Sequence, residues 1–319
     1  MQMENELHLC YKYIFGPVPS RRLGLSLGVD LVPHKTCTLN CVYCECGRTT
    51  HLTLQRSTEY GPVGLIKEEL KAFLAGDPKL DFITFSGSGE PTLHSDIGEV
   101  IRFLKSAYSQ HQVALLTNGT LFYEPQVRKQ ILEADLINVS LDAVTPQTFI
   151  SINRPHRGLK LSLIINGLIS LRKEFEKQLW VEVFLVPGLN DSESELKKIK
   201  NILSMINPDR IQLNTLDRPG TESWVKPLDQ KTLTDIAAYL YDAEIIKRCR
   251  SGYNDQVYMM DFNKRILAAL KRRPCTAEDV SKFLGVQVSG VQSYLDALIA
   301  NGEIKKKEMP RGVFYVVRT

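Results

Sequence analysis

The sequence predicts an α/β protein built mainly around a parallel sheet. From about residue 22 to residue 247, short apolar, β-branched runs alternate with stretches of helical period, and this alternation is typical of βα units. The composition, 43% hydrophobic and 24% charged residues, is that of a globular chain. The length of 319 residues exceeds the roughly 100–150 residues of a common single domain. We therefore expect one large domain and a second, smaller one.

Six strands are expected, each followed closely by Gly, Pro, Asn or Asp, which are residues that form turns. They are Leu23–Val32, Asp81–Phe85, Val113–Leu116, Leu136–Leu141, Trp180–Val186 and Arg210–Leu213. Six βα units are fewer than the eight that close a full barrel. The pattern allows an incomplete TIM-like barrel, (βα)6, or a doubly wound sheet.

Amphipathic helices are expected between these strands. Three of them are Leu65–Leu74, Ile97–Tyr108 and Val127–Leu132. A fourth begins at a capping box formed by Ser192 and Glu195 and runs through Met205.

A different pattern follows Ser251–Met260, which we interpret as a linker between domains 1–250 and 261–319. The last part predicts three helices and two strands, joined by turn residues at Pro310-Arg311-Gly312. These elements are Asn263–Lys271, Ala277–Leu284, Val288–Ala300, Glu303–Glu308 and Val313–Val317. Three helices followed by a hairpin resemble a winged helix-turn-helix.

Positive charge is concentrated in this second domain. The whole chain carries a formal charge of +4, but residues 261–319 hold 11 Lys and Arg against 6 Asp and Glu, and the rest of the chain is close to neutral. Lys305, Lys306 and Lys307 are candidates for neutralising phosphates of a substrate. The third helix offers no arginine to read bases, so we expect no sequence-specific DNA binding. RNA, a docked protein, or a merely solvated basic face stay open.

The chain lacks features of export or membrane insertion. No run approaches the roughly 18 uninterrupted apolar residues of a membrane span, and Met1–Tyr13 lacks the basic start and apolar run of a signal peptide. A cytoplasmic location is expected. Seven cysteines, an odd number in such a chain, favour metal-binding or catalytic thiols over disulfides.

Three of these cysteines form a C-x3-C-x2-C run, at Cys37, Cys41 and Cys44. Four thiolates normally complete an iron–sulfur cluster. Three would leave one iron open for another ligand, as catalytic metal sites do. The alternative is a structural zinc site, with Cys46 or His51 as the fourth ligand.

The run CTLNCVYC resembles the motif of the radical S-adenosylmethionine (radical SAM) enzymes. Four further motifs of that superfamily appear in order, each at the end of an expected strand. They are Ser86–Pro91, Thr117–Gly119, Ser140–Asp142 and Val186–Asp191. The resemblance implies a partial barrel of the radical SAM type. It also implies a 4Fe-4S cluster on the three cysteines and SAM on the open iron, which together yield a 5′-deoxyadenosyl radical.

The resemblance further implies residues that bind the methionine part of SAM. Gly87 and Gly89 would let the backbone approach it, and Ser88 or Glu90 would accept from its ammonium group. The alternative for these residues is an ordinary flexible turn, although not a P-loop, because no Gly-Lys-Ser/Thr follows.

Other residues would bind the rest of SAM. Asn118, Ser140 and Asp142 would bond its carboxylate and ribose hydroxyls, and Tyr43 with Pro187 and Gly188 would flank its adenine. The alternatives are an ordinary loop at Asn118 and a helix N-cap role for Asp142.

Before the first expected strand, the string GPVPSRRLG resembles iron–sulfur oxidoreductases akin to the wyosine-forming tRNA enzymes. Arg21 and Arg22 in it would clamp a phosphate or carboxylate of the substrate, or be solvated charges of an entry loop. Wyosine-forming enzymes carry a second cluster on additional upstream cysteines, and here only Cys10 lies upstream. Tricyclic-base chemistry is therefore doubtful. An auxiliary cluster would need residues scattered along the chain: Cys10, Cys46, Cys249 and Cys275.

We expect a radical SAM enzyme that abstracts hydrogen from a macromolecular substrate. RNA is the first candidate, with the second domain as docking element, and a protein or peptide is the alternative. An electron donor such as flavodoxin or ferredoxin would reduce the cluster. A transcription sensor is disfavoured, because a sensor needs a cluster but no SAM pocket.

Overall fold

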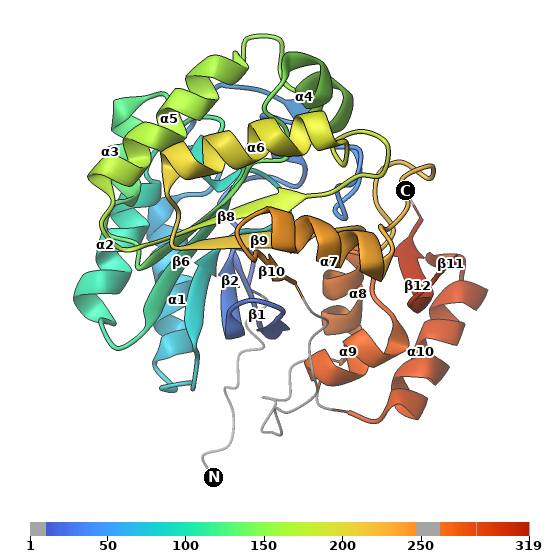
Figure 1. Ribbon diagram of the computed structural model, residues 1–319. Coiled ribbons are helices and arrows are strands. Elements are labelled where there is room, and N and C mark those ends of the chain that lie inside the picture. Colours follow the sequence, from blue (N-terminus) through green and yellow to red (C-terminus); the bar gives the residue numbers. More distant parts are fainter. Residues whose placement is uncertain (1–10, 247–261, 285, 319) are drawn as a thin grey trace.

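The computed structural model describes residues 11–246, 262–284 and 286–318 (Figure 1). Its main feature is an eight-stranded sheet with the order β1-β2-β5-β6-β7-β8-β9-β10. These strands are β1 (Ile14–Ser20), β2 (Gly24–Val29), β5 (Phe82–Phe85), β6 (Gln112–Thr117), β7 (Leu136–Ser140), β8 (Gln178–Phe184), β9 (Arg210–Asn214) and β10 (Glu244–Ile245). A separate short pair consists of β3 (Thr36–Cys37) and β4 (His51–Leu52).

The strand order distinguishes between the two expected architectures. Within this sheet, each strand from β2 onward pairs in parallel with the sheet strand that follows it in sequence, whereas a doubly wound sheet reverses its order at a switch point. β1 is added antiparallel at the edge, and β1 and β10 end the sheet at its two edges. The fold is therefore an open, partial TIM-like barrel, and the doubly wound alternative is wrong.

Helices cover the outer face of this sheet (Figure 1). They are α1 (Val63–Leu74), α2 (Ile97–Ala107), α3 (Pro125–Ile131), α4 (Pro146–Asn153), α5 (Leu161–Glu174), α6 (Glu193–Ile206) and α7 (Gln230–Tyr239). Leu27 and Val29 of β2 pack with Ile66 and Leu70 of α1 in the main apolar core. The predicted capping box is present, because Ser192 Oγ accepts from the backbone N–H of Glu195.

Some elements differ from the expectation. The segment expected to be an entry loop is strand β1, and its two prolines are tolerated because it lies at a sheet edge. Helices α4, α5 and α7 and strand β10 were not predicted. Helix α5 contains Gly167, which weakens its helical signal. A Cβ at Gly167 would lie 2.5 Å from the backbone of Phe122, so close packing explains this glycine.

The last elements have the predicted order. They are α8 (Phe262–Arg272), α9 (Ala277–Leu284), α10 (Val288–Ala300), β11 (Ile304–Met309) and β12 (Gly312–Val317). They enclose a separate apolar cluster that includes Leu270, Val280 and Leu295, and we call described residues 262–318 the C-terminal module. Its identity as a winged helix stays a prediction, and the expected linker lies outside the described residues. None of the described helices has the length and apolar character needed to cross a membrane.

Gly167 gives a test of the helix packing. Although alanine favours helices more than glycine does, Gly167→Ala should lower the free energy of unfolding by about 1–3 kcal/mol, because the methyl group would overlap backbone atoms. Gly64→Ala in α1 is the matched control, since a Cβ there meets nothing within 4 Å. It should leave stability unchanged or raise it by up to about 1 kcal/mol. Denaturant unfolding measures both, and equal effects would refute this packing.

Candidate functional site

The predicted motifs gather at the carboxyl ends of the parallel strands. Residues 37–46, which carry four cysteines and which we call the cysteine loop, follow β2 and lie against the end of α4. The backbone N–H groups of Asn40 and Val42 donate to the carbonyls of Asn153 and Ile152, both at 2.9 Å. The loop is therefore fixed by a helix that is 110 residues distant in sequence.

Each of the three cysteine sulfurs of the C-x3-C-x2-C run accepts a hydrogen bond from a side-chain nitrogen of a different segment. The bonds run from Asn118 Nδ2 to Cys37 Sγ (3.6 Å), from Asn153 Nδ2 to Cys41 Sγ (3.5 Å) and from Lys35 Nζ to Cys44 Sγ (3.1 Å). Hydrogen bonds to the sulfurs are among the features that tune iron–sulfur clusters. The donor set fits thiolate ligands.

The three thiols differ in how readily they ionise. Burial raises the pKa of Cys37 to about 12 and raises the pKa of Cys41 well above its ordinary value. Hydrogen bonding from Cys46, opposed by burial and assisted by the charge of Lys35, lowers the pKa of Cys44 to about 5. Two of the thiols therefore need added positive charge to become thiolates, and metal ions supply such charge.

The described residues favour a cluster over a single metal ion. In residues 11–246, 262–284 and 286–318, no three His, Cys, Asp or Glu side chains are placed to hold one ion. Of the two expected fourth zinc ligands, His51 is exposed and makes an edge contact with the Tyr60 ring, whereas Cys46 hydrogen-bonds to Cys44 and its Sγ lies 3.9 Å from the carbonyl oxygen of Gly87. A four-iron cluster assigns each thiolate to a separate iron, so it does not need such close convergence.

Glu90 joins two of the strand-end motifs. Its Oε1 accepts from Thr117 Oγ1 and Thr92 Oγ1, both at 2.6 Å, and its Oε2 accepts from the backbone N–H of Asn118 at 2.8 Å. Its own N–H donates to the carbonyl of Thr36 at 3.0 Å. Glu90 thus positions the loops after β5 and β6 beside the cysteine loop.

The two expected glycines are required by contacts within the chain. A Cβ at Gly89 would lie 2.3 Å from the carbonyl oxygen of Thr36, and one at Gly87, where φ is +131°, would overlap the carboxyl group of Asp30. Ser88 donates to Asp30 Oδ2 from both its backbone N–H (3.2 Å) and its hydroxyl (3.1 Å). The turn after β5 is therefore packed tightly and is not an ordinary flexible turn.

Asp142 connects the cysteine loop to β8. Its Oδ2 accepts from Tyr43 Oη (2.5 Å) and Asn153 Nδ2 (2.7 Å), and its Oδ1 accepts from the backbone N–H of Phe184 (3.0 Å). Burial raises the pKa of Asp142 to about 6, although these hydrogen bonds oppose the shift. The N-cap alternative for Asp142 is wrong, because the N-cap of α4 is Thr145.

The remaining expected SAM contacts are distributed around this end of the barrel. The Tyr43 ring stacks on Phe184, with centroids 3.8 Å apart. Ser140 ends β7 in register with Glu182. Pro187 and Gly188 lie in the turn after β8, where the N–H of Gly188 donates to Asp191 Oδ1 at 2.8 Å.

The predicted arginine clamp is not free. Arg22 is ion-paired with Glu182 of β8, and Arg21 lies 3.5 Å from Asp217 and 3.9 Å from Glu45. Both guanidinium groups are thus compensated by carboxylates of the same chain, which corrects the expectation of an open clamp or a solvated entry loop.

The three basic residues of β11 differ in their surroundings. Lys306 lies 3.2 Å from Asp296 and is therefore paired within the C-terminal module. Lys305 is exposed and Lys307 is half-buried.

Sequence reasoning missed Lys35 and Asn153. Lys35 is 4% exposed and has a left-handed φ of +59°, and its only sequence signal is its place two residues before the first cysteine. Asn153 ends α4, a helix that was not predicted, and no local pattern marks it. Of the scattered cysteines, Cys275 is buried in the core of the C-terminal module, whereas Cys10 and Cys249 lie outside the described residues.

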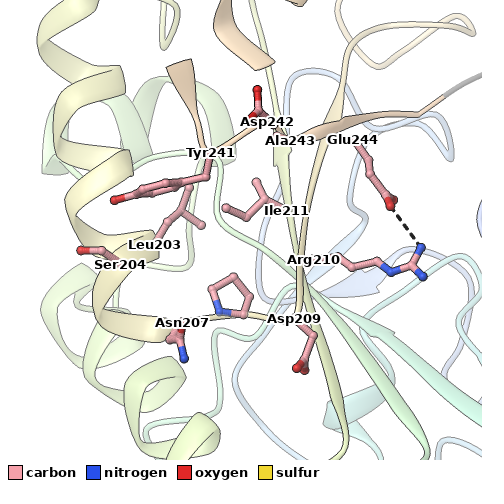
Figure 2. Close-up of a pocket in the computed structure, with 11 residues that line it drawn as sticks. Leu203, Ser204, Asn207, Asp209, Arg210, Ile211, Tyr241, Asp242, Ala243 and Glu244 are labelled. Atoms are coloured by element: carbon pink, nitrogen blue, oxygen red, sulfur yellow. Dashed lines mark hydrogen bonds and ion pairs between the residues drawn. The ribbon is translucent and has the colours of Figure 1, made fainter. Parts of the chain in front are cut away.

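A separate cavity of about 470 Å³ lies at the opposite end of the sheet (Figure 2). Its walls come from the end of α6, the start of β9 and the segment before β10, and they include Arg210, paired with Glu244 at 3.1 Å. Because the predicted motifs gather at the carboxyl ends of the strands, this cavity is not the candidate catalytic site.

Comparison with known proteins agrees with this geometry. Residues 31–198 match the family described as the Radical SAM superfamily. The chain is 31% identical over 309 residues to a UPF0026 protein of Methanocaldococcus jannaschii, covering 95% of each protein. It is 29% identical over 271 residues to a probable GTP 3′,8-cyclase of Methanococcus aeolicus, covering 80% of this chain and 86% of that one.

Another relative is considerably longer than this chain. The protein named GTPase Obg of Brachyspira hyodysenteriae is 35% identical over 319 residues, which cover 98% of this chain but only 46% of that protein. The chain thus spans about half the length of that relative. The present chain contains no Gly-Lys dipeptide, and a P-loop requires one.

A solved structure shows the same fold. The crystal structure of a radical SAM methyltransferase from Sphaerobacter thermophilus superposes with a TM-score of 0.54 at 16% identity, covering 69% of this chain and 64% of that one. The family match spans more than half of the chain, and the UPF0026 relative matches nearly all of it. The chain therefore belongs to the radical SAM superfamily and is an enzyme of the kind that uses SAM and a 4Fe-4S cluster.

Proposed function

We propose that this enzyme abstracts hydrogen from a nucleotide of an RNA, and that Cys37, Cys41 and Cys44 hold its cluster. The observation that carries the cluster assignment is the set of three N–H donors, one to each sulfur. When bound, the cluster and SAM supply a 5′-deoxyadenosyl radical. The protein residues provide position, charge and exclusion of water.

The protein contributes through residues that fix the loops. Lys35 is buried and places a positive charge beside Cys44, which stabilises a thiolate there. Glu90 and Asp142 hold Asn118 and Asn153 in place for the other two sulfurs. We propose that SAM lies among the residues expected from the sequence: Tyr43, Gly87, Ser88, Gly89, Glu90, Asn118, Ser140, Asp142, Pro187 and Gly188.

Two observations support a nucleotide substrate. Residues 261–319 carry an excess of five positive charges, and Lys305 on β11 is exposed, as phosphate binding requires. One relative is named probable GTP 3′,8-cyclase, and GTP is a purine nucleotide. We propose that the electron donor is a flavodoxin or ferredoxin and that the enzyme acts in the cytoplasm.

The cluster assignment predicts a specific loss of SAM cleavage. In anaerobically reconstituted, reduced protein, Cys41→Ala should lower the release of 5′-deoxyadenosine by at least about 100-fold, because one iron loses its thiolate ligand. Cys275→Ala removes a buried thiol from the C-terminal module and should retain release within about twofold. Similar release from Cys41→Ala and the unsubstituted enzyme, measured by liquid chromatography, would contradict the assignment.

The RNA proposal predicts salt-dependent binding. With unfractionated tRNA as the probe, the logarithm of the binding constant should fall linearly with the logarithm of salt concentration, and Lys305→Glu should weaken binding and reduce that slope by about 1. The control is Lys129→Glu, a change of an exposed residue of α3. This helix lies on the side of the barrel away from the C-terminal module (Figure 1), so the variant should leave the slope unchanged. Filter binding measures both. Equal slopes in the two variants would reject RNA as the substrate. Loss of a modification from a protein, with no change in RNA, when the enzyme is removed from cells would reject it too.

A further inference from the structure

The C-terminal module is fixed to the barrel by alternating charges. We call this set the ion-pair network, and its members are Arg21, Glu45, Asp217, Arg218, Asp279 and Arg311. Arg218 of the barrel is buried; its Nη1 lies 2.6 Å from Asp279 Oδ2 of α9 and donates to the carbonyl of Pro274 at 2.9 Å. Since Glu45 lies between Cys44 and Cys46, the network reaches directly into the cysteine loop.

The tip of the β11–β12 hairpin also faces the barrel. Met309 packs against an apolar cluster that contains Val42 and Phe184, and Tyr43 contacts the same cluster. Arg311, in the hairpin turn, pairs with Asp279 and lies 3.6 Å from Asp217. The β11–β12 turn of the C-terminal module therefore forms part of the wall around the candidate site.

This docking places Arg272, at the end of α8, inside the open barrel. Its guanidinium carbon lies 4.3 Å from the centroid of the Phe15 ring. That ring covers Gly28, where a Cβ would lie 2.1 Å from it. Because Leu27 and Val29 of β2 point into the outer core, Gly28 faces the inner side of the sheet. Arg272 thus lies on the inner side, against β1 and β2.

Two buried polar atoms at this position lack partners. Arg272 Nε and Asp30 Oδ1 are both buried with no hydrogen bond. Arg272 interacts electrostatically with Asp30 and with Cys46, so it lies close to the cysteine loop. Leaving a buried donor and a buried acceptor unsatisfied is costly, which suggests that a ligand satisfies both.

We propose that Arg272 and Asp30 form a binding site for the reacting nucleotide of the substrate, with Arg272 holding a phosphate and Asp30 accepting from a hydroxyl or N–H group. The inference rests on the proposed RNA substrate. A guanidinium group binds phosphate through paired N–H donors, and stacking on Phe15 orients it. Asp30 disfavours a bare anion, because its carboxylate repels one unless a donor group lies between them. The site therefore fits a nucleotide better than free phosphate.

The site is formed by two parts of the chain, since Asp30 follows β2 and Arg272 belongs to the C-terminal module.

Arg272→Gln should weaken binding of unfractionated tRNA about fivefold and lower the salt slope by about 1, as expected for one lost phosphate contact. In the unsubstituted enzyme, saturating tRNA should stimulate the release of 5′-deoxyadenosine, because the bound nucleotide is held beside the radical. Arg272→Gln should abolish this stimulation. Inorganic phosphate at the same concentration should not compete.

Controls separate failure of this inference from failure of the proposed function. Lys129→Gln should match the unsubstituted enzyme, and Arg272→Lys should keep the salt slope but lose part of the stimulation, because it keeps the charge without the paired donors. Thermal melting should show that each variant is folded. If the unsubstituted enzyme binds no tRNA, the proposed function fails. If it binds tRNA and Arg272→Gln has the same slope and stimulation, the Arg272 site is wrong.

Discussion

The structure depends on holding three half-buried cysteine sulfurs in one loop, each supplied with an N–H donor. Buried thiolates are unfavourable without compensating charge or hydrogen bonds. The chain provides one donor for each sulfur, from Lys35, Asn118 and Asn153. These residues belong to segments far apart in sequence, so the site forms only when the parallel strands bring their carboxyl ends together.

Two carboxylates maintain this arrangement. Glu90 links the loops after β5 and β6, and Asp142 links β7, α4 and β8 to the cysteine loop. Each accepts several hydrogen bonds in a buried position, where an unsatisfied carboxylate would be strongly unfavourable. These carboxylates position other side chains by accepting hydrogen bonds. Asp142 accepts from Asn153, which also donates to Cys41. Loss of either carboxylate would therefore disturb the site through its donors.

The sequence predicted the parts of the fold that local patterns encode. The six expected strands correspond to β2 and β5–β9 with ends shifted by a few residues, because burial on both faces of a parallel sheet yields continuous apolar runs. Helix α5 was missed because Gly167 is retained for packing against the backbone of Phe122. The partners of Arg22 and Asp142 were also missed. Arg22 pairs with Glu182, 160 residues away, and no periodicity reveals such a contact.

Charge shows the same difference between composition and structure. The sequence places an excess of five positive charges in residues 261–319, but the fold uses several of the basic side chains internally. Arg311 is compensated by Asp279 and Asp217, and Lys306 by Asp296. Charges neutralised within the chain release few counterions when a phosphate approaches.

An RNA would therefore meet fewer cations than the composition implies. The two cations considered for phosphate binding differ in their surroundings: Lys305 is exposed to solvent, whereas Arg272 is partly buried beside the cysteine loop. An exposed lysine attracts any phosphate, but a desolvated arginine with a nearby carboxylate selects the group that satisfies both, so with the proposed RNA substrate the selectivity for the reacting nucleotide would arise inside the barrel.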